Sequence, residues 1–122
     1  MTKPVGLTKN NTWQYGIRRT VPMPFHQVWN FLFSKKGLSL WARHANTQFS
    51  TYIDRSHIRT KWQLPGWSQP VILQLRVLAG NQKTTIAIHV EKMLHQQQRE
   101  EARKYWETTL LYIQNALKTQ VE

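Results

Sequence analysis

Three segments in the second half of the chain alternate between apolar and polar residues, as strands with one buried face do. They span residues 58–64, 71–78 and 84–91, and the turn signals Pro65-Gly66 and Gly80-Asn81 separate them. This alternation is typical of an antiparallel sheet covered on one side only. The apolar face is expected to carry Ile58, Thr60, Trp62, Leu64, Val71, Leu73, Leu75, Val77, Ile86, Ile88 and Val90. The opposite face is expected to carry Arg59, Lys61, Gln63, Gln74, Arg76, Thr85, His89 and Glu91.

A long helix over residues 97–119 is predicted to cover that apolar face. Apolar side chains recur there at three- and four-residue spacing, and at 1.5 Å per residue such a helix is about 34 Å long. Two ion pairs, Glu100 with Lys104 and Arg103 with Glu107, are expected on its solvent side. The inward positions are Ala102, Trp106, Thr109, Leu110, Ile113, Ala116 and Leu117, with Trp106 near the centre of the contact with the sheet.

The first third of the chain predicts one strand and two short helices. Residues 12–21 alternate as a strand does, but Arg19 falls on the apolar side, so the strand is expected to bend or end there. Pro24 suits the first position of a helix, because the N–H that proline lacks is unpaired at that position anyway. Gly37 is expected to end this helix, and a second helical turn follows over residues 38–42.

The composition favours one soluble domain. A chain of 122 residues without cysteine is expected to fold as a single domain over 1–122, with a core that needs no disulfides and a loose lead-in over residues 1–11. The sequence contains no run of about 18 apolar residues, so no membrane span is predicted. The first residues lack the apolar region of a signal peptide, so the expected location is cytoplasmic.

The net charge of +11 is concentrated in the first half of the chain. Residues 1–62 hold ten Lys or Arg and one acid, whereas residues 63–122 hold seven basic and five acidic residues. A basic surface attracts an acidic protein, an anionic lipid or a nucleic acid. No basic run exceeds two residues. Nucleic acid is therefore kept as a possible partner but is ranked below an acidic protein.

The search for catalytic residues yields little. The five histidines show no metal-binding spacing, and the chain has no glycine-rich phosphate loop. His89 and Glu91 stand two apart on one strand, where they could form an acid–base pair. The same pattern is typical of a solvated sheet face. The expectation is therefore a non-catalytic protein without a cofactor or a metal.

Four segments resemble motifs of one family in the same order. They are the Val-Trp helix after a proline-containing link (residues 21–29), a Leu-x-x-Trp turn (37–41), a strand and loop ending in Gly-Trp (56–67), and the last strand and helix (83–117). This order is similar to that of the activator of Hsp90 ATPase homologue 1-like family, within the START-like or Bet v 1-like (SRPBCC) superfamily. The resemblance implies an α+β helix-grip fold, with a curved antiparallel sheet, two short helices and a long C-terminal helix.

The resemblance also implies a binding gap between sheet and helix, because proteins of this superfamily hold apolar molecules there. Only residues 43–55 fill an interval where relatives have two or three more strands, and a short strand over 49–53 is the one signal in it. The gap is therefore expected to be smaller or open. The candidate pocket consists of the inward residues Trp29, Trp41, Trp62, Leu75, Tyr105 and Trp106, which would equally fill the core of a small domain.

Three functions remain open on the sequence. The first is a non-catalytic binder of an apolar small molecule between the sheet and the C-terminal helix. The second is a co-chaperone-like interaction module that docks an acidic partner, as the family name implies. The third is an enzyme of the cyclase type, which the superfamily includes.

Overall fold

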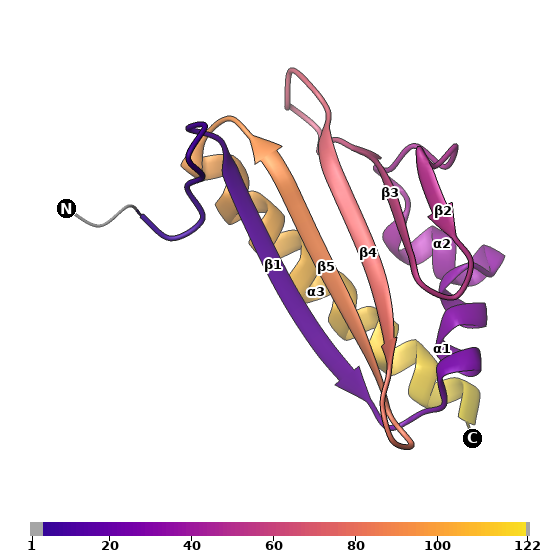
Figure 1. Ribbon diagram of the computed structural model, residues 1–122. Helices are drawn as coiled ribbons and strands as arrows, with labels where there is room; N and C mark the ends of the chain where they lie inside the picture. The colour runs from indigo at the N-terminus through magenta and orange to yellow at the C-terminus, as the bar shows by residue number, and fades with distance from the viewer. Residues whose placement is uncertain (1–3, 122) are drawn as a thin grey trace.

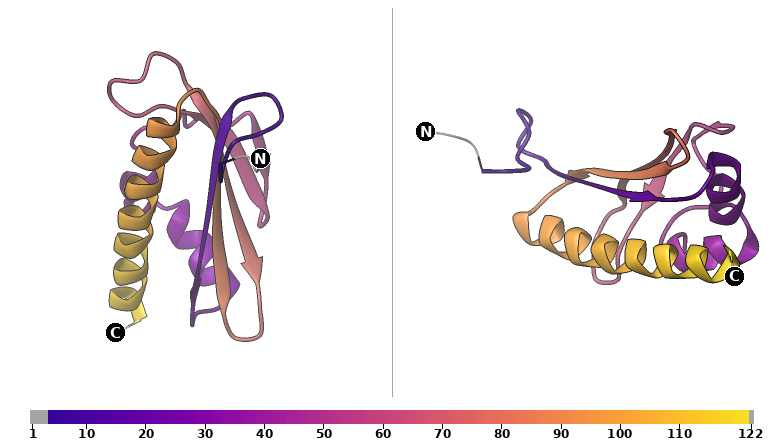
Figure 2. Two further views of the ribbon diagram at one scale, coloured as in Figure 1. Left: turned by 90° about the vertical axis from the view of Figure 1, so that its left-hand side faces the viewer. Right: turned by 90° about the horizontal axis from the view of Figure 1, so that it is seen from below.

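The computed structural model describes residues 4–121, and these residues form a five-stranded antiparallel sheet with three helices against one face (Figures 1 and 2). The sheet order is β1-β5-β4-β3-β2. The predicted α+β helix-grip architecture is confirmed, including the two short helices and the long last one. In chain order the elements are β1 (Trp13–Val21), α1 (Phe25–Leu32), α2 (Lys35–Trp41), β2 (Thr51–Ile53), β3 (His57–Trp62), β4 (Val71–Ala79), β5 (Thr84–Met93) and α3 (Gln96–Val121).

Each helix covers a different part of the sheet or of the helical layer. The helix α3 runs along β1 and β5, α1 contacts β4, and α2 contacts both α1 and α3 (Figure 2). The core lies between this helical layer and the inner face of the sheet. The other face of β1, β5 and β4 carries no helix and is turned toward the viewer in Figure 1. No helix within residues 4–121 is long and apolar enough to cross a membrane.

The alternation of the three later strands is confirmed. Leu73, Leu75 and Ile86 are fully buried on the inner face. Arg59 on β3 stands opposite Gln74 on β4 and donates a hydrogen bond of 3.3 Å to it on the outer face. A shift of one residue in strand pairing would exchange the inner and outer faces. The observed positions therefore confirm which residues were predicted to face inward and which outward.

The last helix is confirmed within a residue or two at each end. Its 26 residues span about 39 Å, and Trp106 is fully buried with its ring 5.8 Å from that of Trp62. Arg103 pairs with Glu107 at 3.2 Å as expected, but Glu100 pairs with Arg103 at 2.8 Å rather than with Lys104. The guanidinium group of Arg103 has enough donors to serve both carboxylates at once.

The break between the first two helices differs from the prediction. The helix α1 ends at Leu32, and Gly37 lies inside α2 rather than ending a helix. Ser34 begins α2 by accepting a hydrogen bond of 3.1 Å from the Gly37 N–H. A Cβ atom at Gly37 would stand 1.9 Å from the carbonyl oxygen of Phe31. Glycine is therefore required here because the two helices approach closely, which is a tertiary contact that the local pattern does not contain.

The strand β1 does not end at Arg19. It pairs with β5 as far as Val21, which is buried again. Arg19 stays half-buried and donates a hydrogen bond of 2.8 Å to the Arg18 carbonyl oxygen, so its charge is not enclosed. Of the predicted lead-in, residues 1–3 lie outside the described part of the chain, and Leu7 forms a bridge with Trp13.

Candidate functional site

The six residues predicted to line a pocket are all directed inward, and the structure divides the five aromatic ones between two clusters. Trp29 and Trp41 pack among rings from α1, α2 and the segment that leads into β2. The second group, which we call the Trp62 cluster, lies between β3 and α3. The Trp62 cluster consists of His44, Trp62, Trp67, Tyr105 and Trp106.

The first group is part of the core. Trp41 is fully buried, and its indole N–H donates a hydrogen bond of 2.7 Å to the Leu32 carbonyl oxygen. Leu75 is fully buried between Ile58 and Ile88 on the neighbouring strands. The polar atom of the Trp41 side chain is thus paired within the core, and Leu75 has no polar side-chain atom.

The Trp62 cluster is a compact group of rings in mutual contact. The Trp62 ring centroid lies 5.3 Å from that of Tyr105, 5.5 Å from that of Trp67 and 5.8 Å from that of Trp106. Tyr105 and Trp106 are 5.2 Å apart, and His44 approaches Tyr105 at 5.6 Å. Aromatic pairs at these separations are favourable, so the rings hold one another in place.

Three polar atoms inside this cluster have no hydrogen-bond partner. They are the indole Nε1 atoms of Trp62 and Trp106 and the hydroxyl oxygen of Tyr105, all shielded from solvent. By contrast, the indole N–H of Trp67 donates a hydrogen bond of 2.8 Å to Glu101. A buried polar group left unpaired costs about 1–3 kcal/mol, and native interiors pair most of them. Three in one cluster are therefore an exceptional concentration.

The pKa of Tyr105 also reflects the burial of its phenol away from solvent. Burial raises the pKa of its phenol, and the hydroxyl of Thr109 and the charge of Arg43 oppose that shift. Thr109 is thus close enough to influence the phenol without forming a hydrogen bond of ordinary geometry with it. The phenol stays protonated at neutral pH and is available as a donor.

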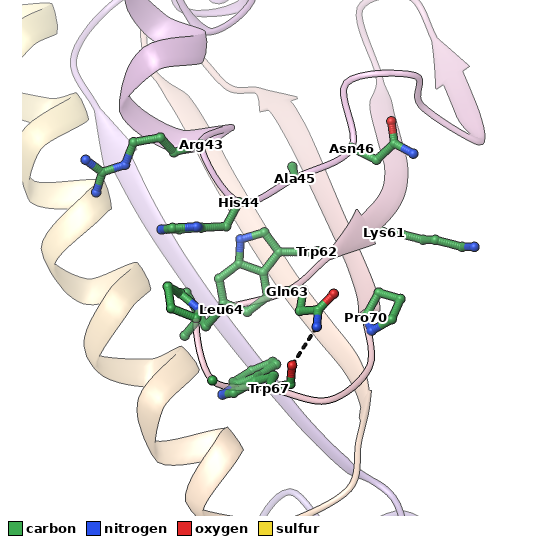
Figure 3. A pocket seen from close by; sticks show the side chains of 12 residues that line it. Arg43, His44, Ala45, Asn46, Lys61, Trp62, Gln63, Leu64, Trp67 and Pro70 are labelled. Carbon is green, nitrogen blue, oxygen red and sulfur yellow. Dashed lines mark hydrogen bonds between the residues drawn. The ribbon is translucent and has the colours of Figure 1, made fainter.

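A surface pocket of about 610 Å³ opens beside this cluster (Figure 3). Its walls come from residues 43–46, which follow α2, and from residues 61–67 with Pro70, which follow β3. Figure 3 shows the Trp62 indole between His44 on one side and Trp67 on the other. Gln63 fixes the loop that carries Trp67, because its amide donates a hydrogen bond of 2.6 Å to the Trp67 carbonyl oxygen.

Of the six predicted residues, Trp62 lines this pocket, and Tyr105 and Trp106 lie behind Trp62 through ring contacts. Sequence reasoning missed His44 and placed Trp67 in a loop without a role. The Ala45–Trp62 bridge and the hydrogen bond of 2.8 Å from the Asn46 N–H to the Lys61 carbonyl oxygen hold the 43–46 segment against β3. No local periodicity marks that segment, so the sequence carried no signal for it.

The residues considered for catalysis lie elsewhere. His89 and Glu91 are 3.7 Å apart on the outer face of β5, where Glu91 also pairs with Arg59. Within residues 4–121 no group of three or more His, Asp or Glu side chains comes together in the manner of a metal site.

Comparisons with known proteins place the fold among helix-grip domains. No family model matches the chain, and no curated protein sequence matches it. Among solved structures, CalU16 from Micromonospora echinospora aligns with a TM-score of 0.74 and 13% identity, over 94% of this chain and 83% of that one. The Aha1 dimer from Colwellia psychrerythraea aligns with a TM-score of 0.68 and 9% identity, over 85% of this chain and 95% of that one.

A third solved structure is longer than this chain. DynU16, a protein of the dynemicin biosynthetic locus, aligns with a TM-score of 0.75 and 12% identity over 88% of this chain. The present chain spans 48% of the length of DynU16. At these identities the likeness is one of fold, and function must be argued from the site itself.

Proposed function

We propose that this protein is a non-catalytic domain that binds a small, planar, largely apolar molecule at the Trp62 cluster. The ligand would enter through the pocket between residues 43–46 and 61–67. The observation that carries the proposal is the set of three unpaired polar groups on Trp62, Tyr105 and Trp106. Each can donate a hydrogen bond, so a molecule with an acceptor atom would satisfy groups that the protein leaves unpaired. Trp62 lines the pocket but Tyr105 and Trp106 do not, and all three atoms are shielded from solvent, so binding requires the rings to separate when the ligand enters.

The pocket itself suits such a ligand. Its volume of about 610 Å³ falls in the range of about 300–1,000 Å³ that is usual for small-molecule sites. Leu64 and Trp67 supply apolar surface. The polar side chains of the lining are Arg43, His44, Asn46, Lys61 and Gln63. A lining that combines the Trp67 ring with several hydrogen-bonding side chains favours a planar ligand that carries a carbonyl or ether oxygen.

A matched pair of probes tests the role of the acceptor. Fluorene and 9-fluorenone have the same planar frame, and only the second has a carbonyl oxygen. We expect 9-fluorenone to quench tryptophan fluorescence saturably and to bind about 3- to 10-fold more tightly than fluorene, since a hydrogen bond contributes about 0.5–1.5 kcal/mol. Equal affinity for both probes would remove the observation on which the proposal rests.

Two tryptophan variants provide the control. Trp62→Phe keeps an aromatic ring but removes an unpaired N–H, whereas Trp41→Phe removes an N–H that is already paired with Leu32. We expect Trp62→Phe to reduce the preference for 9-fluorenone over fluorene, and Trp41→Phe to lower stability while leaving that preference intact. The reverse result would move the site from the Trp62 cluster into the core.

A second candidate function is an interaction module that docks an acidic partner. The net charge of +11 favours it, and Arg18, Lys61 and Arg76 project from the sheet face opposite α3. Polyglutamate is a suitable probe, and its affinity is expected to fall steeply between low and high salt because exposed charges are screened. An affinity that does not change with salt would contradict this electrostatic docking.

A further inference from the structure

The outer face of the sheet contains a second cavity, of about 490 Å³, which shares no lining residue with the pocket beside the Trp62 cluster. It crosses β1, β5 and β4, the three strands that face the viewer in Figure 1. Its residues are Gly16, Ile17, Arg18, Gln74, Arg76, Ala87, Ile88 and His89. We refer to it as the outer groove.

The strand register explains why a groove forms there. Arg18 on β1 and Arg76 on β4 both stand directly opposite Ala87 on β5, so the three residues form one row across the sheet. In the next row Gly16 stands opposite His89. Because Ala87 has only a methyl group and Gly16 has no side chain, the floor is low. The two arginines rise on either side of it from strands about 10 Å apart.

The charges of these arginines are not neutralised by the protein. Among the residues that the structure describes, no carboxylate lies within ion-pair distance of Arg18 or Arg76. The nearest acid along β5 is Glu91, whose carboxylate is held by Arg59 and lies 3.7 Å from His89. Two unpaired guanidinium groups that flank a low floor form a site of strong positive potential.

We propose that the outer groove binds a phosphate group, held between Arg18 and Arg76 above Gly16 and Ala87. Guanidinium groups bind phosphate oxygens through two parallel hydrogen bonds each. Two cations facing one another match the charge of a phosphate monoester, which approaches −2 at neutral pH. Gln74 and His89 line the same groove and supply further polar contacts. This site is independent of the one proposed at the Trp62 cluster.

The size and lining of the groove narrow the ligand to a small phosphomonoester. A volume of about 490 Å³ exceeds what a bare phosphate ion occupies and lies in the range for small-molecule sites. Binding of single-stranded nucleic acid relies on aromatic side chains on which bases stack. None of the residues that line the outer groove is Phe, Tyr or Trp.

The test is an NMR titration of the protein at constant ionic strength, with chloride as the balancing anion. The probes are inorganic phosphate, glycerol 3-phosphate, glycerol and acetate. We expect saturable shifts of the backbone amide signals of Gly16, Ala87 and His89 with both phosphates. Glycerol and acetate are expected to produce none. Acetate that binds as tightly as phosphate would overturn the choice of phosphate in favour of a carboxylate-bearing partner.

Two double variants with equal net charge decide whether the groove is specific. Arg18→Gln with Arg76→Gln removes both proposed ligands and should weaken glycerol 3-phosphate binding at least 10-fold. Lys35→Gln with Lys36→Gln removes two exposed charges on α2 and should change the affinity less than twofold. Arg18→Lys with Arg76→Lys keeps the charge and should give an intermediate loss, because lysine lacks the planar fork. Shifts that do not saturate, or equal losses in both glutamine variants, would show a diffuse ion atmosphere and overturn the site.

Discussion

Tyr105 is the residue at which stability and binding are expected to conflict. Its hydroxyl group is buried without a partner, so the empty protein carries an unfavourable contribution that a ligand acceptor would relieve. Tyr105→Phe removes that group and keeps the ring contacts with Trp62 and Trp106. We expect the free energy of unfolding, measured by urea denaturation, to rise by about 1 kcal/mol.

The same variant is expected to bind 9-fluorenone more weakly than the wild type, because one of three donors is gone. Fluorene serves as the control, and its affinity should not change. A loss of stability in Tyr105→Phe would instead show that the hydroxyl is paired in solution, either with Thr109 or with an enclosed water molecule.

The raised pKa of Tyr105 gives a second measurement on this residue. As the pH rises past about 10, the unfolded chain loses the phenolic proton first, and the folded protein, whose pKa is raised by burial, still holds it. The stability of the protein is therefore unaffected by this group below about pH 10 and falls as the pH rises through the folded-state pKa. Burial and Glu107 raise the pKa of Tyr15 as well, so Tyr105→Phe should reduce the alkaline loss of stability without abolishing it.

At the scale of the elements, α3 is held by one face only. Trp106 is fully buried against the sheet, whereas Tyr112 on the same helix is 57% exposed. Trp106→Ala is expected to lower the free energy of unfolding by about 3–5 kcal/mol and to leave the domain unfolded or molten. Tyr112→Ala should stay within about 0.5 kcal/mol of the wild type. Similar melting temperatures for the two variants would mean that α3 does not pack against the sheet through the face that carries Trp106.

The contact between α1 and α2 depends on a single missing side chain. Gly37→Ala would place a Cβ atom 1.9 Å from the Phe31 carbonyl oxygen, whereas Gly16→Ala would meet nothing closer than 3.7 Å. We expect Gly37→Ala to destabilise the protein by about 1–3 kcal/mol, as overpacked interiors do, and Gly16→Ala to have little effect. Thermal unfolding followed by circular dichroism measures both. If alanine is tolerated equally at the two positions, the helices are not in the close contact described.

These elements show what the sequence could and could not predict. The strands β3 to β5 and the helix α3 were predictable because alternation and helical spacing are local and each has one apolar face. The end of α1 and the position of Gly37 were not, since the reason for glycine is a carbonyl group of the preceding helix. The six candidate residues were correctly placed inside. Their division between the core and the cluster with unpaired groups depends on contacts between residues far apart in the chain, such as His44 with Tyr105.

The outer groove could likewise not be predicted from the sequence. No local pattern marks Arg18, Arg76 or Ala87 as part of a site. The alternation of β1, β4 and β5 predicts that they lie on the outer face but not that they lie side by side. Their alignment in a single row follows from the order β1-β5-β4 and from the register of both strand pairs. Long-range register is set by turns and by the core together, so it emerges only in the folded molecule.

At the scale of the whole molecule, the two proposed sites lie on opposite faces of one sheet. Successive residues of a strand point to opposite faces, so the inner Leu75 and the outer Arg76 are neighbours in β4 but belong to different surroundings. Between the faces lies a core in which Leu73, Leu75 and Ile86 are fully buried. A packed layer of this kind couples two sites only where it has two alternative arrangements, and nothing in the described sheet supplies a second one.

We therefore expect the two sites to bind independently. The dissociation constant of 9-fluorenone should change less than twofold when glycerol 3-phosphate is saturating, and the reverse titration should agree, because coupling between sites is reciprocal. The variants supply the controls: Arg18→Gln with Arg76→Gln should retain 9-fluorenone binding, and Tyr105→Phe should retain glycerol 3-phosphate binding. Since each ligand stabilises only the folded state, the two increases in melting temperature should be approximately additive. A change in either affinity of more than about threefold would show that the sheet does transmit binding from one face to the other.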